Sequence, residues 1–297
     1  MELKKSMSQK LRMDGRDYSR LGWYFVTLGA DYHKMLFGKI EGVAMCPNAL
    51  GELVDKCWAE IPAHYGHIEL GAWQLMPNHF HGLVRIIRAG GAGLGQVLNM
   101  FKGSVTREWR QQNEVSRNGG KETEQVWAPN YWDVICFEPE MLEIRERYVR
   151  ANPRRWALKG VPCGRVKQSS YVGNVDLLAA AGERRVLRVS RKSSAADIVA
   201  LQDELTSFEG VVCSTFFSPG ERECLKTVLS GSASVVWLLP MAIPESIPAA
   251  WTDAFLEKRA LWLSAFTEPE ASRASCKQAN EWVRVFCADY RHGEKER

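Results

Sequence analysis

A chain of 297 residues, 45% hydrophobic and 25% charged, has the composition of a globular protein with one or two domains. No apolar run reaches the roughly 20 residues that a membrane-spanning helix needs, so the sequence predicts no membrane partner. The net charge is +4. Its excess of Lys and Arg lies within residues 1–165, and a basic N-terminal part suits a polyanionic partner.

The N-terminal residues 1–20 form a basic, polar arm without the apolar centre of a signal peptide. The eight cysteines are scattered along the chain and include no C-x-x-C pair. This usage favours reduced thiols over a zinc site or a disulfide framework, and we therefore expect a cytoplasmic protein.

The first half of the chain predicts a small antiparallel sheet with helices packed on it. Apolar residues at helical spacing and short aromatic or β-branched runs define these elements. In order, we expect a strand over 23–28, an extended stretch over 37–45, a helix over 49–61, strands over 68–76 and 79–87, a helix over 96–111, a polar loop tip over 112–125, an extended aromatic stretch over 126–137 and a helix over 139–152.

Two histidines lie close together in the run W-Q-L-M-P-N-H-F-H-G-L-V-R-I, where a Pro-Asn turn precedes the second strand. Side chains alternate along a strand, so His79 and His81 should share one face and Phe80 should lie on the other. Two adjacent imidazoles make half of a metal site. The spacing alone is more typical of solvent-facing strand histidines, and the surrounding motifs decide between these interpretations.

The helix expected over 139–152 carries Tyr148 and Asn152 four residues apart, and this spacing places both on one helical face. Pro153 should end the helix, because proline lacks the amide hydrogen that a helix interior requires. Taken alone, Tyr148 is typical of a core or surface residue, and Asn152 of a polar residue at a helix end.

Four separated stretches together resemble the single-tyrosine HUH transposases of the type associated with repetitive extragenic palindromes. They are M-P-N-H-F-H-G-L-V, F-K-G-S-V-T-R, V-W-A-P-N-Y-W-D-V-I and R-Y-V-R-A-N-P, in the family's order within about residues 18–158. The resemblance implies an α+β domain over 1–160, in which helices pack on an RRM-like antiparallel sheet. It also implies that His79 and His81 hold a divalent ion, Mg or Mn.

The same resemblance assigns Asn152 as the third metal ligand and Tyr148 as the nucleophile. The implied function is that of a metal-dependent single-stranded DNA endonuclease and strand transferase, acting through a 5′-phosphotyrosine at hairpin or palindromic DNA. A phenol is protonated at neutral pH, so attack on phosphorus needs help from a divalent ion that polarises the phosphate. Tyr131 is the next candidate for the nucleophile.

Four basic side chains are candidates for contacts with DNA phosphates, although each fits a solvated helix surface equally well. They are Lys102, Arg107, Arg145 and Arg150. Two alternatives remain open: a domesticated protein that binds a DNA or RNA hairpin without cutting it, and a defence or regulatory protein whose C-terminal part senses a nucleotide or a partner.

Beyond residue 160 the pattern changes. Residues 161–183 are rich in Gly, Pro and Ser and are predicted to be a linker, and apolar strands then alternate with helices over 184–292. Continuous apolar strands between helices predict an α/β domain with a parallel sheet covered on both faces. We expect strands over 186–190, 210–216, 235–239 and 261–266, and helices over 194–207, 218–229, 249–259 and 272–290.

Three sequence segments of this part resemble the Rossmann-like domain of DNA-processing protein A. They are S-T-F-F-S-P-G-E-R-E-C-L, V-V-W-L-L-P and S-R-A-S-C-K-Q-A-N. Ligands of such sheets bind outside the carboxyl ends of the strands. This rule nominates Ser214, Thr215 and the amides of the helix that Ser218 caps, with Glu221 completing a capping box. No G-x-G-x-x-G is present, so we expect no dinucleotide, and we favour a packing or protein-interaction module without a ligand.

Overall fold

The computed structural model describes residues 19–112, 125–180 and 182–293, with side chains up to residue 285. The chain divides between Ala157 and Leu158 into two compact units. The expected basic arm over 1–20 and the loop tip over 112–125 lie almost entirely outside the described residues. No helix within these ranges combines the length and the hydropathy needed to cross a membrane.

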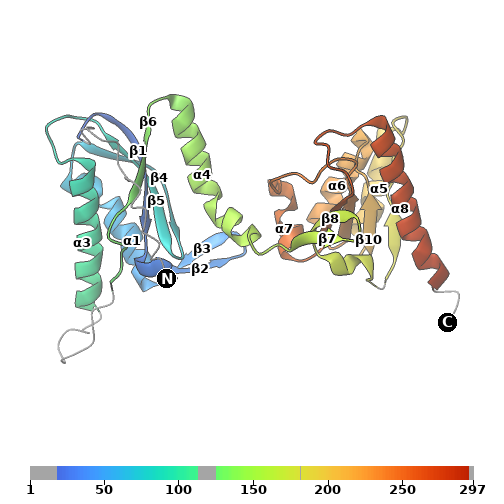
Figure 1. Ribbon diagram of the computed structural model, residues 1–297, viewed down its shortest axis with the longest axis horizontal. Helices are drawn as coiled ribbons and strands as arrows, with labels where there is room; N and C mark the ends of the chain where they lie inside the picture. The colour runs from blue at the N-terminus through green and yellow to red at the C-terminus, as the bar shows by residue number, and fades with distance from the viewer. Residues whose placement is uncertain (1–18, 113–124, 181, 294–297) are drawn as a thin grey trace, which may run out of the picture. The chain divides into compact units, whose positions relative to one another are not determined.

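The first unit is built on a four-stranded antiparallel sheet with the order β4-β5-β1-β6 (Figure 1). The expected stretch over 37–45 is a separate two-stranded hairpin, which turns at Gly42 with a φ of 57°. The strands are β1 (Gly22–Gly29), β2 (Gly38–Glu41), β3 (Ala44–Pro47), β4 (Ile68–Met76), β5 (His79–Ile86) and β6 (Trp132–Cys136), and a 3-10 turn η1 (Asp31–His33) follows β1.

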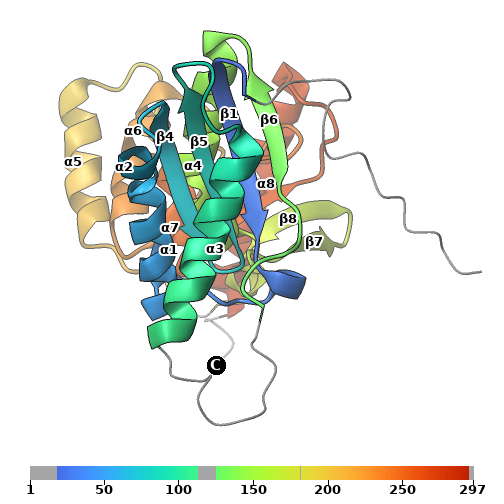
Figure 2. The ribbon, with the colours of Figure 1, turned by 90° about the vertical axis from the view of Figure 1, so that its left-hand side faces the viewer.

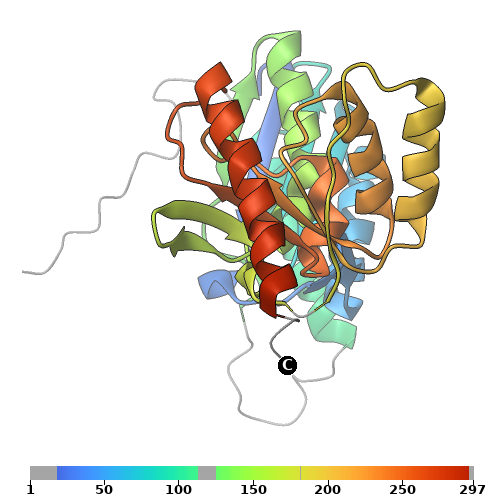
Figure 3. The same cartoon turned by 90° about the vertical axis from the view of Figure 1, so that its right-hand side faces the viewer.

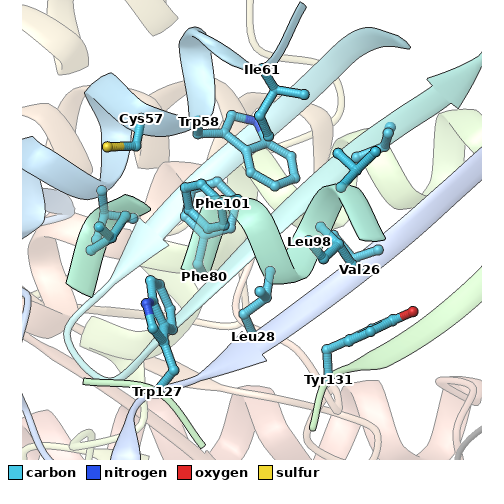
Figure 4. Packing of buried hydrophobic residues seen from close by; sticks show 14 of the residues in the cluster. Val26, Leu28, Cys57, Trp58, Ile61, Phe80, Leu98, Phe101, Trp127 and Tyr131 are labelled. Atoms are coloured by element: carbon cyan, nitrogen blue, oxygen red, sulfur yellow. The ribbon is translucent and has the colours of Figure 1, made fainter. Parts of the chain in front are cut away.

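Two longer helices cover one face of this sheet, as Figure 2 shows. They are α1 (Ala49–Ala59) and α3 (Leu94–Gln112), with the short α2 (Ile61–His64) between them. Asn48 caps α1 by accepting a hydrogen bond from the amide of Gly51 at 3.0 Å. The rings of Trp58 on α1, Phe80 on β5 and Phe101 on α3 pack together, with Trp58–Phe80 centroids 4.6 Å apart (Figure 4).

A close approach at Gly82 gives the first testable expectation. A Cβ on Gly82 would overlap the indole ring of Trp58, which is fully buried. Gly82→Ala is therefore expected to lower the free energy of unfolding by about 1–3 kcal/mol, the usual cost of overpacking a core. Gly103→Ala on α3 is the matched control, because nothing lies within 4 Å of the added carbon.

Chemical denaturation of both variants measures this difference. Gly103→Ala should leave stability unchanged or raise it by up to about 1 kcal/mol, the helix propensity difference between Gly and Ala. Equal stabilities of the two variants would show that Trp58 moves aside without cost.

The long helix α4 (Pro139–Leu158) lies on the opposite side of the sheet from α3 (Figure 1). The expectation that Pro153 ends this helix was wrong, because α4 continues for more than a turn beyond it. Proline in a helix interior costs about 3 kcal/mol. Val149 and Pro153 are both buried, and the burial of their apolar surface offsets that cost.

The second unit contains a six-stranded sheet with the order β7-β8-β12-β11-β10-β9. The four strands from β9 to β12 are parallel, whereas β8 is antiparallel to β12 and β7 is antiparallel to β8. The strands are β7 (Cys163–Val166), β8 (Ser169–Gly173), β9 (Arg184–Val186), β10 (Val211–Ser214), β11 (Ser234–Leu238) and β12 (Ala260–Ser264).

Residues 161–183 are not the linker that their composition predicted. They hold β7, β8 and the 3-10 turn η2 (Val175–Leu178), so the sheet is mixed rather than wholly parallel. Gly, Pro and Ser are also the residues of turns between short edge strands, and composition alone does not separate the two cases. Lys167, with a φ of 52°, makes the turn of this hairpin.

Helices cover both faces of the second sheet, and α8 crosses one of them (Figure 3, red). Apolar side chains of α5, α6 and α7 pack on the other face. The bounds are α5 (Ala195–Thr206), α6 (Pro219–Ser230), the 3-10 turn η3 (Ala249–Trp251), α7 (Thr252–Leu256) and α8 (Arg273–Gly293). The capping box of Ser218 and Glu221 is confirmed.

Two expected elements of this unit differ from the structure. The strand expected over 186–190 lies earlier, as β9 over Arg184–Val186. Pairing with β10 ends at Val186, so the residues after it are not part of the strand. The helix expected over 249–259 is split into η3 and α7. Lys258, with a φ of 59°, has a left-handed conformation that a helix cannot continue through.

Candidate functional site

The two histidines of β5 point to the sheet face that α4 covers. The ring centroids of His79 and His81 are 4.6 Å apart, and Phe80 between them is buried on the opposite face against Trp58. The alternation predicted from the sequence is therefore what the strand shows. His81 is only 5% exposed, so it is not a solvent-facing strand histidine.

Each imidazole has its Nδ1 atom beside a side-chain oxygen. His79 Nδ1 is 2.7 Å from Asn78 Oδ1, and His81 Nδ1 is 2.8 Å from Thr27 Oγ1. Thr27 reaches His81 because the register of β1 and β5 places these residues opposite each other. When Nδ1–H donates to such an oxygen, Nε2 carries the free lone pair and is the atom that can bind a metal ion.

The environment of His81 keeps it uncharged. Burial, together with the neighbouring charges of His79 and Arg145, lowers the pKa of His81 to about 3. The ring also stacks on Phe25, with centroids 5.2 Å apart. A neutral imidazole held in one orientation is the form that binds metal ions.

One face of α4 meets this histidine pair. Tyr148, Asn152 and Trp156 follow one another at intervals of four residues and share that face. The Tyr148 ring lies 5.4 Å from the His81 ring, and the Trp156 ring lies 6.0 Å from the His79 ring. Asn152 lies one turn from each, on the same face of α4.

Asn152 is 7% exposed, and its Nδ2 atom donates to the carbonyl of Tyr148 at 3.4 Å. This bond directs the amide nitrogen back to the helix and leaves Oδ1 as the possible ligand atom. In the described ranges, no three His, Cys, Asp or Glu residues are grouped so as to hold a metal ion. Asn152 adds a side-chain oxygen to the two imidazoles on this face of the sheet.

Two arginines flank the tyrosine. The guanidinium carbon of Arg155 lies 5.3 Å from the centre of the Tyr148 ring, and that of Arg145 lies 5.2 Å from the centre of the Phe25 ring. Guanidinium groups bind phosphate oxygens in a two-pronged geometry. Arg145 was among the predicted phosphate contacts, whereas Arg155 was not.

The other predicted basic residues lie elsewhere. Lys102 and Arg107 are on α3, which packs on the opposite face of the sheet, and Arg150 is exposed on α4. The ammonium group of Lys102 donates to the carbonyls of Ala128 at 2.6 Å and Pro129 at 3.3 Å, and burial lowers its pKa. Lys102 therefore holds the segment before β6 and does not reach the tyrosine.

Tyr131, the second candidate for the nucleophile, is 6% exposed in the core beneath α1 and α3 (Figure 4). It is therefore on the wrong face of the sheet for the histidine pair. Sequence reasoning missed four residues of the site: Thr27, Asn78, Arg155 and Trp156. Asn78 directly precedes His79, and Trp156 continues the four-residue interval from Asn152. The sequence alone could therefore have identified these two residues as part of the site.

The site nominated in the second unit is largely closed. Ser214 and Thr215 are 1% and 3% exposed. The carboxylate of Glu221 accepts the amide hydrogens of Phe217 at 2.8 Å and Ser218 at 3.2 Å, so these two amides directly before α6 are already satisfied. An anion at these two amides would have to displace Glu221.

No family model matches the chain, and its likenesses to known proteins include the following three. An uncharacterized protein of Haemophilus influenzae is 28% identical over 169 residues, which cover 50% of this chain and 89% of that protein. A REP-associated tyrosine transposase bound to a REP hairpin has a TM-score of 0.36 and 14% identity, over 49% of this chain and 74% of its own.

A putative transposase from Deinococcus radiodurans has a TM-score of 0.30 and 16% identity, over 46% of this chain and 95% of its own. Each of the three likenesses therefore spans about half of this chain.

Proposed function

We propose that the first unit is a metal-dependent single-stranded DNA endonuclease and strand transferase that acts at hairpin or palindromic DNA. The observation that carries this proposal is the position of Tyr148 beside the buried, neutral His81, on the sheet face where His79 and His81 lie together. A nucleophile next to a preformed pair of metal ligands is the arrangement that phosphoryl transfer requires.

The residues fit a divalent cation. His79 and His81 have their Nδ1 atoms beside side-chain oxygens, and Asn152 has an oxygen to offer. A structural zinc site has four protein ligands, whereas two imidazoles and one amide oxygen leave positions open. This set of ligands therefore suits a catalytic Mn²⁺ or Mg²⁺ ion better than a structural zinc ion. When bound, the ion supplies electrostatic polarisation of the scissile phosphate.

Tyr148 then acts as the nucleophile. Its phenol loses its proton as the oxygen forms a bond to phosphorus, and the bond from phosphorus to the 3′ oxygen breaks. The leaving oxygen takes up a proton as a 3′ hydroxyl, so the proton count is unchanged overall. The downstream strand stays joined to Tyr148 through its 5′ phosphate. This ester retains the free energy needed for rejoining, so no ATP is required.

The neighbouring side chains bind and orient the strand. Arg145 and Arg155 lie where their guanidinium groups can bind phosphates on either side of Tyr148. Trp132 on β6 is 44% exposed and lies edge-on to Phe25, with ring centroids 6.2 Å apart. An exposed indole at this place offers a stacking surface for an unpaired base.

A panel of labelled single-stranded hairpins incubated with Mn²⁺ tests the proposal on a denaturing gel. We expect a hairpin whose label moves with the protein after denaturation, which marks the covalent adduct. Tight binding of hairpins without any adduct would instead support a binding protein that does not cut DNA.

A fragment of residues 1–160 is expected to stay folded and to cut single-stranded DNA at a rate within about fivefold of the whole chain, because unit 1 has its own core. The fragment ends before β7, which belongs to the sheet of the second unit. Circular dichroism and the hairpin assay check the fragment. A folded fragment without cleavage would show that the second unit completes the active site.

A further inference from the structure

The second unit contains a cavity of about 860 Å³ at the carboxyl ends of β9 and β10. We propose that this cavity binds a small phosphorylated ligand of nucleotide size, whose phosphates contact Arg188, Arg191 and Arg273. The proposal concerns a unit separate from the tyrosine site and does not depend on the proposed cleavage reaction.

The positive charge of the cavity lining is the first observation that supports an anionic ligand. Arg188 and Arg191 come from the segment after β9, and Arg273 is the first residue of α8. Within the described part of the chain, none of these three side chains is recorded in an ion pair. Three arginines that line one cavity favour a compact ligand with several negative charges over an extended strand.

The carboxylate in the lining does not cancel this charge. Glu221 is 6% exposed, and its oxygens accept amide hydrogens from Val189 at 3.4 Å, Phe217 at 2.8 Å and Ser218 at 3.2 Å. These three hydrogen bonds stabilise the carboxylate, and one carboxylate stands against three arginines in the lining. The cavity keeps an excess of positive charge from its arginines.

The segment that carries two of the arginines is fixed in place. Ser218 Oγ donates to the carbonyl of Val189 at 2.9 Å, and the amide of Val189 donates to Glu221. The amide of Lys192 donates to Ser190 Oγ at 3.1 Å. The bonds of Val189 tie this segment to the start of α6, and the bond between Lys192 and Ser190 holds the turn at Arg191, so less ordering is required when a ligand binds.

A strained residue adjoins the cavity. Phe216, directly after β10, has a φ of 46°, which is costly for a side chain other than glycine. Its amide donates to Ser214 Oγ at 3.0 Å, and its carbonyl accepts from Arg222 at 3.3 Å. Such strain persists at ligand sites, and here it places the flanking Thr215 and Phe217 in the cavity lining.

The size and position of the cavity define the ligand class. Pockets for small ligands typically have volumes of ~300–1,000 Å³. This volume is far larger than a single phosphate needs, and the carboxyl edge of parallel strands is where such sheets bind ligands. Asn280 also lines the cavity, and its Nδ2 atom donates to Cys276, so Oδ1 is left to accept from a sugar hydroxyl.

Calorimetric titration of the full chain with ADP, inorganic pyrophosphate and adenosine tests the proposal. ADP and pyrophosphate should bind, and adenosine should bind at least about 100-fold more weakly than ADP, because it lacks the phosphates. Arg191→Ala and Arg273→Ala should each weaken ADP about 10- to 100-fold, the range for loss of a charge-assisted contact.

The matched control is Arg284→Ala, which removes the same charge from an exposed position of α8 outside the cavity lining. It should bind ADP as the unmodified chain does, and unchanged thermal unfolding of all three variants excludes misfolding. Failure of both ADP and pyrophosphate to bind at millimolar concentration overturns the proposal. So does an equal effect of all three substitutions, or displacement of ADP by a single DNA strand whose own binding needs Arg191 and Arg273.

Discussion

Tyr148→Phe is expected to abolish the covalent protein–DNA adduct, by at least ~1,000-fold, while hairpin binding stays within about twofold. The substitution removes only the hydroxyl group, and the ring keeps its contacts with Phe25 and His81. A label at the 3′ end of the strand should move with the unmodified protein on a denaturing gel, because the downstream fragment carries the phosphotyrosine. A 5′ label should report the released fragment.

Tyr131→Phe is the control, since Tyr131 lies in the core on the other face of the sheet. This variant should form adducts at the rate of the unmodified protein once its folding is verified. Adducts that persist in Tyr148→Phe would remove Tyr148 from the mechanism and would leave the proposed function without a nucleophile in the described part of this site.

His81→Ala is expected to slow cleavage by at least ~100-fold, because loss of an imidazole removes one ligand of the ion that polarises the phosphate. His79→Ala should behave in the same way, and excess EDTA should stop the unmodified protein. His64→Ala is the matched control, since His64 is exposed at the end of α2. Cleavage rates over a range of Mn²⁺ concentrations measure the effect.

Calorimetric titration with Mn²⁺ separates loss of the metal from loss of the fold. His81→Ala should lose Mn²⁺ binding, whereas Tyr148→Phe should keep it because the histidines and Asn152 are unchanged. Cleavage that continues unchanged in the presence of chelator would contradict the metal mechanism, even if both histidine variants were inactive.

The local arrangement around the histidines followed from the sequence because it depends on short-range geometry. Alternation along β5 places His79 and His81 on the face opposite Phe80, and the four-residue interval on α4 aligns Tyr148 with Asn152. The partner of His81 could not be found in this way. Thr27 lies 54 residues earlier, and only the pairing register of β1 and β5 brings the two together.

The predictions that failed depended on residue types that are compatible with more than one local structure. Gly, Pro and Ser over 161–183 predicted a linker, but they are the turns and edges of β7 and β8. Pro153 predicted the end of a helix, but buried surface on α4 offsets its local cost. Tertiary packing decides each of these cases.

The hairpin of β7 and β8 has a consequence for aggregation. β8 covers the edge of β12, whose central residues Leu261 and Trp262 are fully buried. A protein that began at residue 184 would lack this cover, and the bare amides and carbonyls of an apolar strand would pair with other molecules. With the hairpin present, the outermost strand is β7, which is short and carries Arg165. An isolated second unit should therefore begin before β7, so that the edge of β12 stays covered.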